Sequence, residues 1–149
     1  NTSSGNGGLY PLPTTPIYAA TKAAVTSISE VLRAQLEMTG SRIQASVLFP
    51  GPNIVRTNIF TAQRNRPAAL PLEKEASTPP PTLEEIGAML ESVGMAFGVT
   101  EPEEAAEHAF EGIRANRFWL LPPSDHIDQR IRDRVESILK RENPRLTFF

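Results

Sequence analysis

A tyrosine and a lysine stand four residues apart in the segment that runs from Tyr18 to Lys22. Residues four apart share one face of a helix, so the phenol and the ammonium would be neighbours. A nearby ammonium favours the phenolate, which makes a phenol usable as a general acid and base near neutral pH. A serine hydroxyl from a separate loop, Ser3 or Ser4, can hydrogen-bond the oxygen of a carbonyl or an alcohol. Together these groups suit hydride chemistry at a carbon–oxygen bond.

Three segments with recognisable spacing follow one another in the first part of the chain. Residues 1–7 read N-T-S-S-G-N-G, residues 18–22 read Y-A-A-T-K, and residues 50–57 read P-G-P-N-I-V-R-T. In this order they resemble the N-x-S-S-x-x-G, Y-x-A-S-K and P-G…V-x-T motifs of the short-chain dehydrogenase/reductase family, with Thr21 for the usual serine. One Y-x-x-x-K arises often by chance, but three motifs in series are a specific signal. The resemblance extends to about Leu121.

The resemblance implies catalytic roles for three residues. Ser4, which stands three residues before Gly7 as in the family motif, would be the hydroxyl that orients the substrate, although Ser3 is adjacent. Tyr18 would be the acid and base, and Lys22 would activate Tyr18 and bind the nicotinamide ribose. The alternative is an exposed serine in a loop beside a solvated helix face.

The same resemblance makes Pro50, Gly51, Val55 and Thr57 contacts of the nicotinamide end of NAD or NADP. A glycine permits close approach of the backbone. Backbone groups near Val55 would reach the carboxamide, and the Thr57 hydroxyl would reach the amide or a phosphate. The alternative is a plain turn that ends a strand, since Pro-Gly is a common turn pair.

Residues 58–98 correspond to the substrate-binding loop and helix of the family. Ile59 and Phe60 would contact the substrate together with Ser4 and Tyr18, and a bulky, largely apolar secondary alcohol or ketone is expected. Further candidates for the apolar substrate pocket are Leu70, Leu72, Met89 and Met95. Arg64 and Arg66 could bind an anionic substrate. The alternative is that the apolar residues pack in a lid or core and that the arginines are solvated.

The dinucleotide signature of the family, a glycine-rich turn that opens a helix, has no counterpart in the sequence. Residues 5–8 are glycine-rich, but Tyr10 and Pro11 follow, so no helix begins there to hold a pyrophosphate. We therefore expect residues 1–149 to be the C-terminal part of a single Rossmann-type domain, which assembles as a homodimer or homotetramer when full length. A non-catalytic remnant that serves as an assembly or interaction module is the second interpretation.

Composition narrows the functional classes. The net charge of −2 gives no electrostatic reason to expect nucleic acid or an anionic membrane as a partner. The chain has no cysteine, which excludes disulfides and thiolate chemistry and suits a cytoplasmic protein. No apolar run approaches the roughly 18 residues of a membrane span, and neither histidine has a spaced partner, so we expect no membrane association and no metal.

Helical and strand patterns alternate along the chain, as in the back half of a doubly wound parallel α/β sheet. Apolar periodicity predicts helices over about 17–38, 83–97, 101–116 and 125–141. Three of them begin with a capping signal: a capping box at Thr82–Glu85, a capping box at Thr100–Glu103 and a serine cap at Ser124. Apolar runs predict buried strands over 43–49 and 118–121, with Trp119 in the core.

The helix patterns also predict which side chains face inward. The first helix would bury Val25, Ile28, Leu32 and Leu36, while Arg33 pairs with Glu37 and the mixed-charge run 130–136 forms a solvated face. About two strands and the tip of a third would leave a sheet edge and much apolar surface uncovered. We therefore expect the chain by itself to be aggregation-prone or molten.

Overall fold

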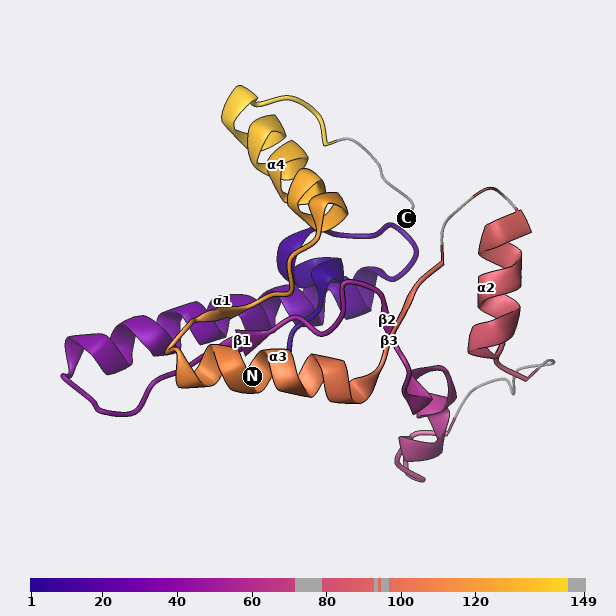
Figure 1. The fold of residues 1–149 in the computed structure, drawn as a ribbon, viewed down its shortest axis with the longest axis horizontal. Coiled ribbons are helices and arrows are strands. Elements are labelled where there is room, and N and C mark those ends of the chain that lie inside the picture. Colours follow the sequence, from indigo (N-terminus) through magenta and orange to yellow (C-terminus); the bar gives the residue numbers. More distant parts are fainter. Residues whose placement is uncertain (72–78, 93, 95–96, 145–149) are drawn as a thin grey trace.

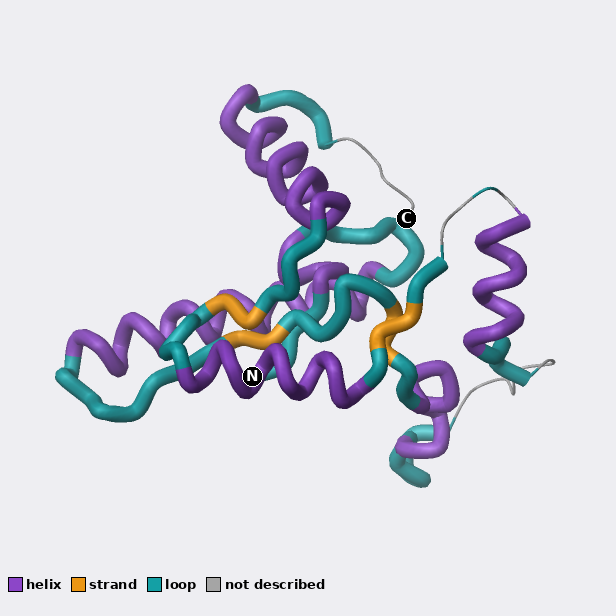
Figure 2. Tube along the Cα trace, viewed as in Figure 1, coloured by secondary structure: helices purple, strands orange, loops and turns teal. Residues whose placement is uncertain are grey.

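The computed structural model describes residues 1–71, 79–92, 94 and 97–144. Short parallel strands run between two helices, α1 (Pro16–Met38) and α3 (Pro102–Arg114), as Figures 1 and 2 show. The helical turn η1 (Gly5–Leu9) precedes α1, and α4 (Asp125–Lys140) extends from the end of the last strand. The α/β class with parallel strands that the sequence predicts is thereby confirmed.

The strand β1 (Val47–Leu48) is central in this sheet. It pairs in parallel with β4 (Trp119–Leu120), with Val47 opposite Trp119 and Leu48 opposite Leu120. On its other side the first residues of the chain form a parallel bridge, Thr2 with Leu48, and the Ser3 amide donates to the Leu48 carbonyl at 2.8 Å. This sheet therefore contains two strands and the tip of a third, as the sequence predicts.

Both strands are shorter and less buried than their apolar runs suggest. The first begins only at Val47, and Ile43 is 71% exposed. Trp119 is 45% exposed, so its assignment to the core is wrong. Successive side chains of a strand point to opposite faces: Leu120 is buried beside Gly112 of α3. On the other face Trp119 has its ring stacked on Phe49 but reaches solvent.

A second parallel pair, β2 (Ile54–Val55) with β3 (Val99–Thr100), has no counterpart among the elements predicted from sequence. It connects the body of the molecule to η2 (Asn58–Asn65) and α2 (Leu83–Ser92), which stand apart from α1 and α3 in Figure 1. Arg56 follows β2, and its guanidinium pairs with Glu101 at 2.9 Å. The hydrogen bond and charge of Glu101 raise the pKa of Arg56 above its ordinary value.

The helix ends agree in part with the sequence signals. The capping box is present before α2, where the Thr82 amide donates to Glu85 at 2.8 Å and the Glu85 amide donates to the Thr82 hydroxyl at 3.2 Å. Ser124 caps α4 by accepting from the Ile127 amide. The capping box predicted at Thr100 is wrong, because Thr100 lies in β3 and Glu101 precedes α3.

The inward face of α1 consists of small and hydroxyl-bearing side chains, Ala19, Thr26 and Ser29. The predicted inward stripe is wrong in part, since Ile28 is 64% exposed and Leu32 is 38% exposed. The glycines of η1 explain why the inward side chains of α1 are small. A Cβ on Gly7 would collide with the Ala19 carbonyl, and a Cβ on Gly8 would lie 2.7 Å from the Thr26 hydroxyl. A backbone this close to the helix leaves no room for large side chains.

Large apolar side chains remain exposed on three helices. Such residues on α1, α3 and α4 include Ile17, Val31, Leu32, Met38, Phe110, Ile113, Val135, Ile138 and Leu139. The uncovered apolar surface that the strand count predicts is therefore present. Its effect on the folding of the chain stays a prediction.

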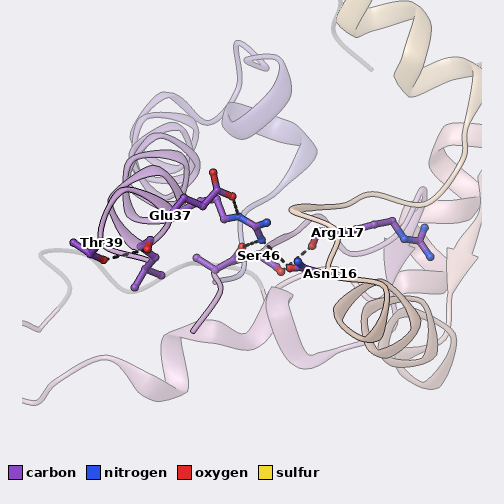
Figure 3. A network of polar contacts seen from close by, with 8 residues as sticks. Glu37, Thr39, Ser46, Asn116 and Arg117 are labelled. Atoms are coloured by element: carbon purple, nitrogen blue, oxygen red, sulfur yellow. Dashed lines mark hydrogen bonds and ion pairs between the residues drawn. The ribbon is translucent and has the colours of Figure 1, made fainter. Parts of the chain in front are cut away.

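A polar network joins α1 to the turn that follows α3 (Figure 3). Arg33 pairs with Glu37, as the spacing predicts, and donates to the Asn116 side chain at 3.0 Å. Ser46, just before β1, donates from its hydroxyl to the Arg117 carbonyl at 2.9 Å. The network therefore fixes the two helices on either side of the β1–β4 pair.

Candidate active site

Two neighbouring parallel segments end at the same edge of the sheet and bring Ser4 and Pro50 to it. Ser3 is bonded to Leu48 in the first segment, and Phe49 donates from its amide to Leu120 in the next. Ser4 and Pro50 are the residues that follow. In open parallel α/β sheets, ligands bind beyond the carboxyl ends of the strands. This edge is therefore where the candidate residues should be assembled.

The structure distinguishes the two adjacent serines. Ser3 is 2% exposed, its hydroxyl donates to the Lys22 carbonyl at 2.9 Å, and it lies 2.8 Å from the Thr26 hydroxyl. Ser4 is half-buried with an extended backbone, and among the described residues its hydroxyl has no hydrogen-bond partner. Ser3 therefore anchors the loop, whereas the Ser4 hydroxyl is unengaged among the described residues.

Tyr18 and Lys22 lie on one face of α1, as their spacing predicts. The Lys22 ammonium is 5.6 Å from the centre of the Tyr18 ring and donates to the Thr2 carbonyl at 3.2 Å. Tyr18 is 37% exposed, so its phenol is accessible to a ligand. The lysine thus stands between the aromatic ring and the strand segment that leads to Ser4.

The Pro50–Thr57 segment is only partly a loop. Gly51 is buried with φ +103°, and a Cβ there would collide with the Asn53 carbonyl, so only glycine suits this turn. Val55 belongs to β2 and is paired with Thr100. Thr57 is exposed at the start of η2 and makes no capping bond with its side chain. The segment therefore combines a tight turn after β1 with an exposed hydroxyl at Thr57.

The structure does not bring the predicted substrate contacts Ile59 and Phe60 to Tyr18. Both belong to η2, which Figure 1 shows away from α1, and Ile59 is exposed. Of the further apolar candidates, Leu70 and Met89 are exposed, and Leu72 and Met95 lie outside the described residues.

The two arginines that could bind an anionic substrate form hydrogen bonds within their own segment instead. Arg64 donates to the carbonyls of Asn58 and Thr61, at 2.8 and 3.1 Å. Arg66 donates to the Gln63 side chain at 3.1 Å and to the Leu70 carbonyl at 2.9 Å.

Arg130 is a residue whose position the sequence interpretation missed. The mixed-charge run predicts a solvated face, but Arg130 is 7% exposed, with its guanidinium 5.0 Å from the centre of the Tyr10 ring. The signal lies in its spacing: Arg130 is three residues after the buried Ile127 and so shares its helix face. Arg134, one turn further on, donates to the Leu9 carbonyl at 2.6 Å.

The part of the chain that the structure describes also bears on metal binding and on membrane spans. No three histidine, cysteine, aspartate or glutamate side chains gather there as they would around a metal ion. None of the described helices combines the length and the hydropathy needed to cross a bilayer.

Comparison with known proteins adds to this geometry. Residues 1–68 match the family described as short chain dehydrogenase. Farnesol dehydrogenase from Aedes aegypti is 43% identical over 52 residues, which are 35% of this chain and 20% of that protein. An uncharacterised short-chain type dehydrogenase/reductase from Sinorhizobium fredii is 43% identical over 58 residues, 39% of this chain and 22% of that protein.

A solved structure resembles the whole described fold. It is a short chain dehydrogenase/reductase from Burkholderia phymatum in complex with NAD, 32% identical, with a TM-score of 0.77. The similarity covers 99% of this chain and 50% of that one. The present chain thus spans half the length of this solved relative, and the matched segments span about a fifth of each curated relative.

Proposed function

Because the chain belongs to the short-chain dehydrogenase/reductase family, we propose that it is the catalytic part of an NAD(P)-dependent oxidoreductase that interconverts a secondary alcohol and a ketone. The observation that carries the proposal is the Lys22 ammonium, which lies beside the Tyr18 ring and bonds to Thr2, two residues before Ser4, whose hydroxyl has no hydrogen-bond partner among the described residues. Residues 1–149 would then form the C-terminal part of one Rossmann-type domain.

Each side chain has a distinct role in this mechanism. Ser4 and Tyr18 hydrogen-bond the substrate oxygen. In oxidation the Tyr18 phenolate accepts the hydroxyl proton as the substrate carbon loses its hydride, and in reduction the neutral phenol returns the proton. Lys22 holds its positive charge beside the Tyr18 ring, and its ammonium also binds the nicotinamide ribose.

The residues after β1 suit a nicotinamide cofactor, which when bound accepts or supplies the hydride. Gly51 permits the tight turn after β1, because a Cβ there would collide with the Asn53 carbonyl. The exposed Thr57 hydroxyl and the backbone near Val55 offer hydrogen bonds, with Pro50 closing the turn. That the solved relative is in complex with NAD supports this assignment, with NAD and NADP both compatible with these residues.

The substrate we propose is bulky and largely apolar. Ile59 and Phe60 would cover it if η2 approaches Tyr18 when ligands bind. The name of the Aedes aegypti relative, farnesol dehydrogenase, supports an apolar alcohol as the class.

The proposal is tested by titrating NADH and NADPH onto the purified intact protein and following nicotinamide fluorescence. A panel of apolar secondary alcohols is then supplied with the oxidised form of the nucleotide that binds. We expect saturable binding and formation of reduced nicotinamide. A folded protein that binds neither nucleotide would contradict the proposal.

A second candidate is an assembly module without catalysis. Ile17 and Met38 are 78% and 86% exposed at opposite ends of α1, with further apolar side chains between them. Exposed apolar surface of this kind commonly marks a protein interface, and a homodimer or homotetramer would cover it. Light scattering on the purified protein tests this: a monomer at all concentrations would remove the module interpretation.

A further inference from the structure

A cavity of about 480 Å³ lies between η1, the first turns of α1 and the helix α4. Its walls are mainly apolar, with Pro11, Leu12 and Pro13 on one side and Ala19, Ala20 and Ala23 of α1 on another. Ser4, Tyr18 and Lys22 are not among the described residues that line it. The cavity therefore lies beside the candidate active site without including these three side chains, and its volume is in the range of small-molecule sites.

One buried cation forms part of the wall. Arg130 lines the cavity, and two of its guanidinium nitrogens, Nε and Nη2, are closed off from water with no hydrogen-bond acceptor among the described residues. These two nitrogens form the side edge of the guanidinium, whose parallel N–H bonds match the two oxygens of a carboxylate. Buried charged donors without an acceptor are unfavourable, so the site is incomplete as it stands.

The neighbouring polar groups are already engaged. Tyr10 faces the guanidinium with its ring, and Arg134 at the cavity is bonded to the Leu9 carbonyl. Asp133 also lines the cavity, but it accepts from the Gln129 amide at 2.9 Å. No ion pair between described residues joins Asp133 to Arg130. The guanidinium of Arg130 thus has no ionic partner among the described residues.

We propose that this cavity binds a carboxylate that carries an apolar chain. The carboxylate accepts two hydrogen bonds from Nε and Nη2 of Arg130, and the chain lies between Pro11–Pro13 and the three alanines of α1. Because this edge of the guanidinium is closed to water, the Arg130 side chain turns towards the cavity when the ligand binds. This inference does not depend on the proposed oxidoreductase activity.

The test is calorimetric titration of octanoate and of octan-1-ol, which share a chain and differ in the carboxylate, into the intact protein. We expect saturable octanoate binding. Octan-1-ol should bind with an affinity lower by about tenfold or more, because it cannot form the charge-assisted bidentate bond with Arg130. Arg130→Met should remove this preference. Arg132→Met, an exposed arginine on the same helix, is the matched control and should bind octanoate like the wild type.

A second variant acts from the opposite wall. Ala20→Leu fills the cavity without changing a charge and should weaken octanoate binding even if Arg130→Met fails to fold. Tyr18→Phe should bind octanoate normally, which separates this site from the catalytic proposal. Equal binding of acid and alcohol, or unchanged octanoate affinity in a folded Arg130→Met variant, would overturn the inference. So would a wild-type protein that binds neither, because a carboxylate of the protein itself would then complete Arg130.

Discussion

The hydroxyl of Ser3 donates to the main-chain carbonyl of Lys22 at 2.9 Å. Lys22 in turn donates from its ammonium to the carbonyl of Thr2, next to Ser3 in the chain. These reciprocal bonds tie the strand end that presents Ser4 to the helix that presents Tyr18. The position of the candidate catalytic hydroxyl relative to the phenol is therefore fixed by a residue that does no chemistry itself.

Replacing the two serines should have opposite consequences. Ser3→Ala removes a buried hydroxyl bonded to Lys22 and Thr26, and should lower the free energy of unfolding by about 1–3 kcal/mol. Ser4→Ala should leave stability nearly unchanged and lower kcat/KM. Denaturant unfolding and steady-state kinetics on both variants check this. A Ser3→Ala protein of normal stability and reduced activity, beside a fully active Ser4→Ala protein, would reverse the assignment.

Gly8→Ala should disturb the site by overpacking. The added Cβ would collide with the Ser3 hydroxyl and lie 2.7 Å from that of Thr26, so we expect a loss of about 1–3 kcal/mol in stability and a marked loss of activity.

Gly40→Ala is the control for this substitution. Gly40 has a positive φ of 64° with no atom within 4 Å of the added Cβ, so its replacement should affect stability alone. Thermal unfolding and activity are measured on both, and an active Gly8→Ala enzyme would show that close contact of η1 with α1 is unnecessary.

Lys22→Met should impair both cofactor binding and the chemical step. The substitution keeps an unbranched side chain on α1 and removes the charge beside Tyr18, so we expect weaker NADH or NADPH binding and a kcat reduced by about 10²-fold or more. Glu30→Gln, a charge change on the exposed side of the same helix, serves as the comparison. Normal nucleotide affinity in a folded Lys22→Met protein would show that Lys22 does not bind the ribose.

Local signals account for what the sequence predicts correctly. The Tyr18–Lys22 pair, the bounds of α1 and the Thr82–Glu85 cap all depend on residues within a few positions of one another. The spacing of four residues places the ammonium by the ring whatever the rest of the chain does.

Long-range contacts account for what the sequence does not predict. The pair β2–β3 joins two-residue strands far apart in the chain, too short to show a period. Arg130 is buried because Tyr10, near the other end of the chain, faces it. The small residues Ala19 and Thr26 on the inward side of α1 lie against the glycines of η1, a contact that no local pattern predicts. Apolar periodicity predicts which face of a helix is apolar, but it does not predict which other segment packs against that face.

The most direct test of the central claim is the effect of Tyr18→Phe on hydride transfer in the intact protein. The substitution removes only the phenol oxygen, so the fold and the affinity for NADH or NADPH should be preserved. We predict that turnover falls by about 10²–10⁴-fold, the contribution of a positioned general acid and base. Turnover close to that of the wild type, with the same nucleotide affinity, would contradict the assignment of Tyr18 as the acid and base.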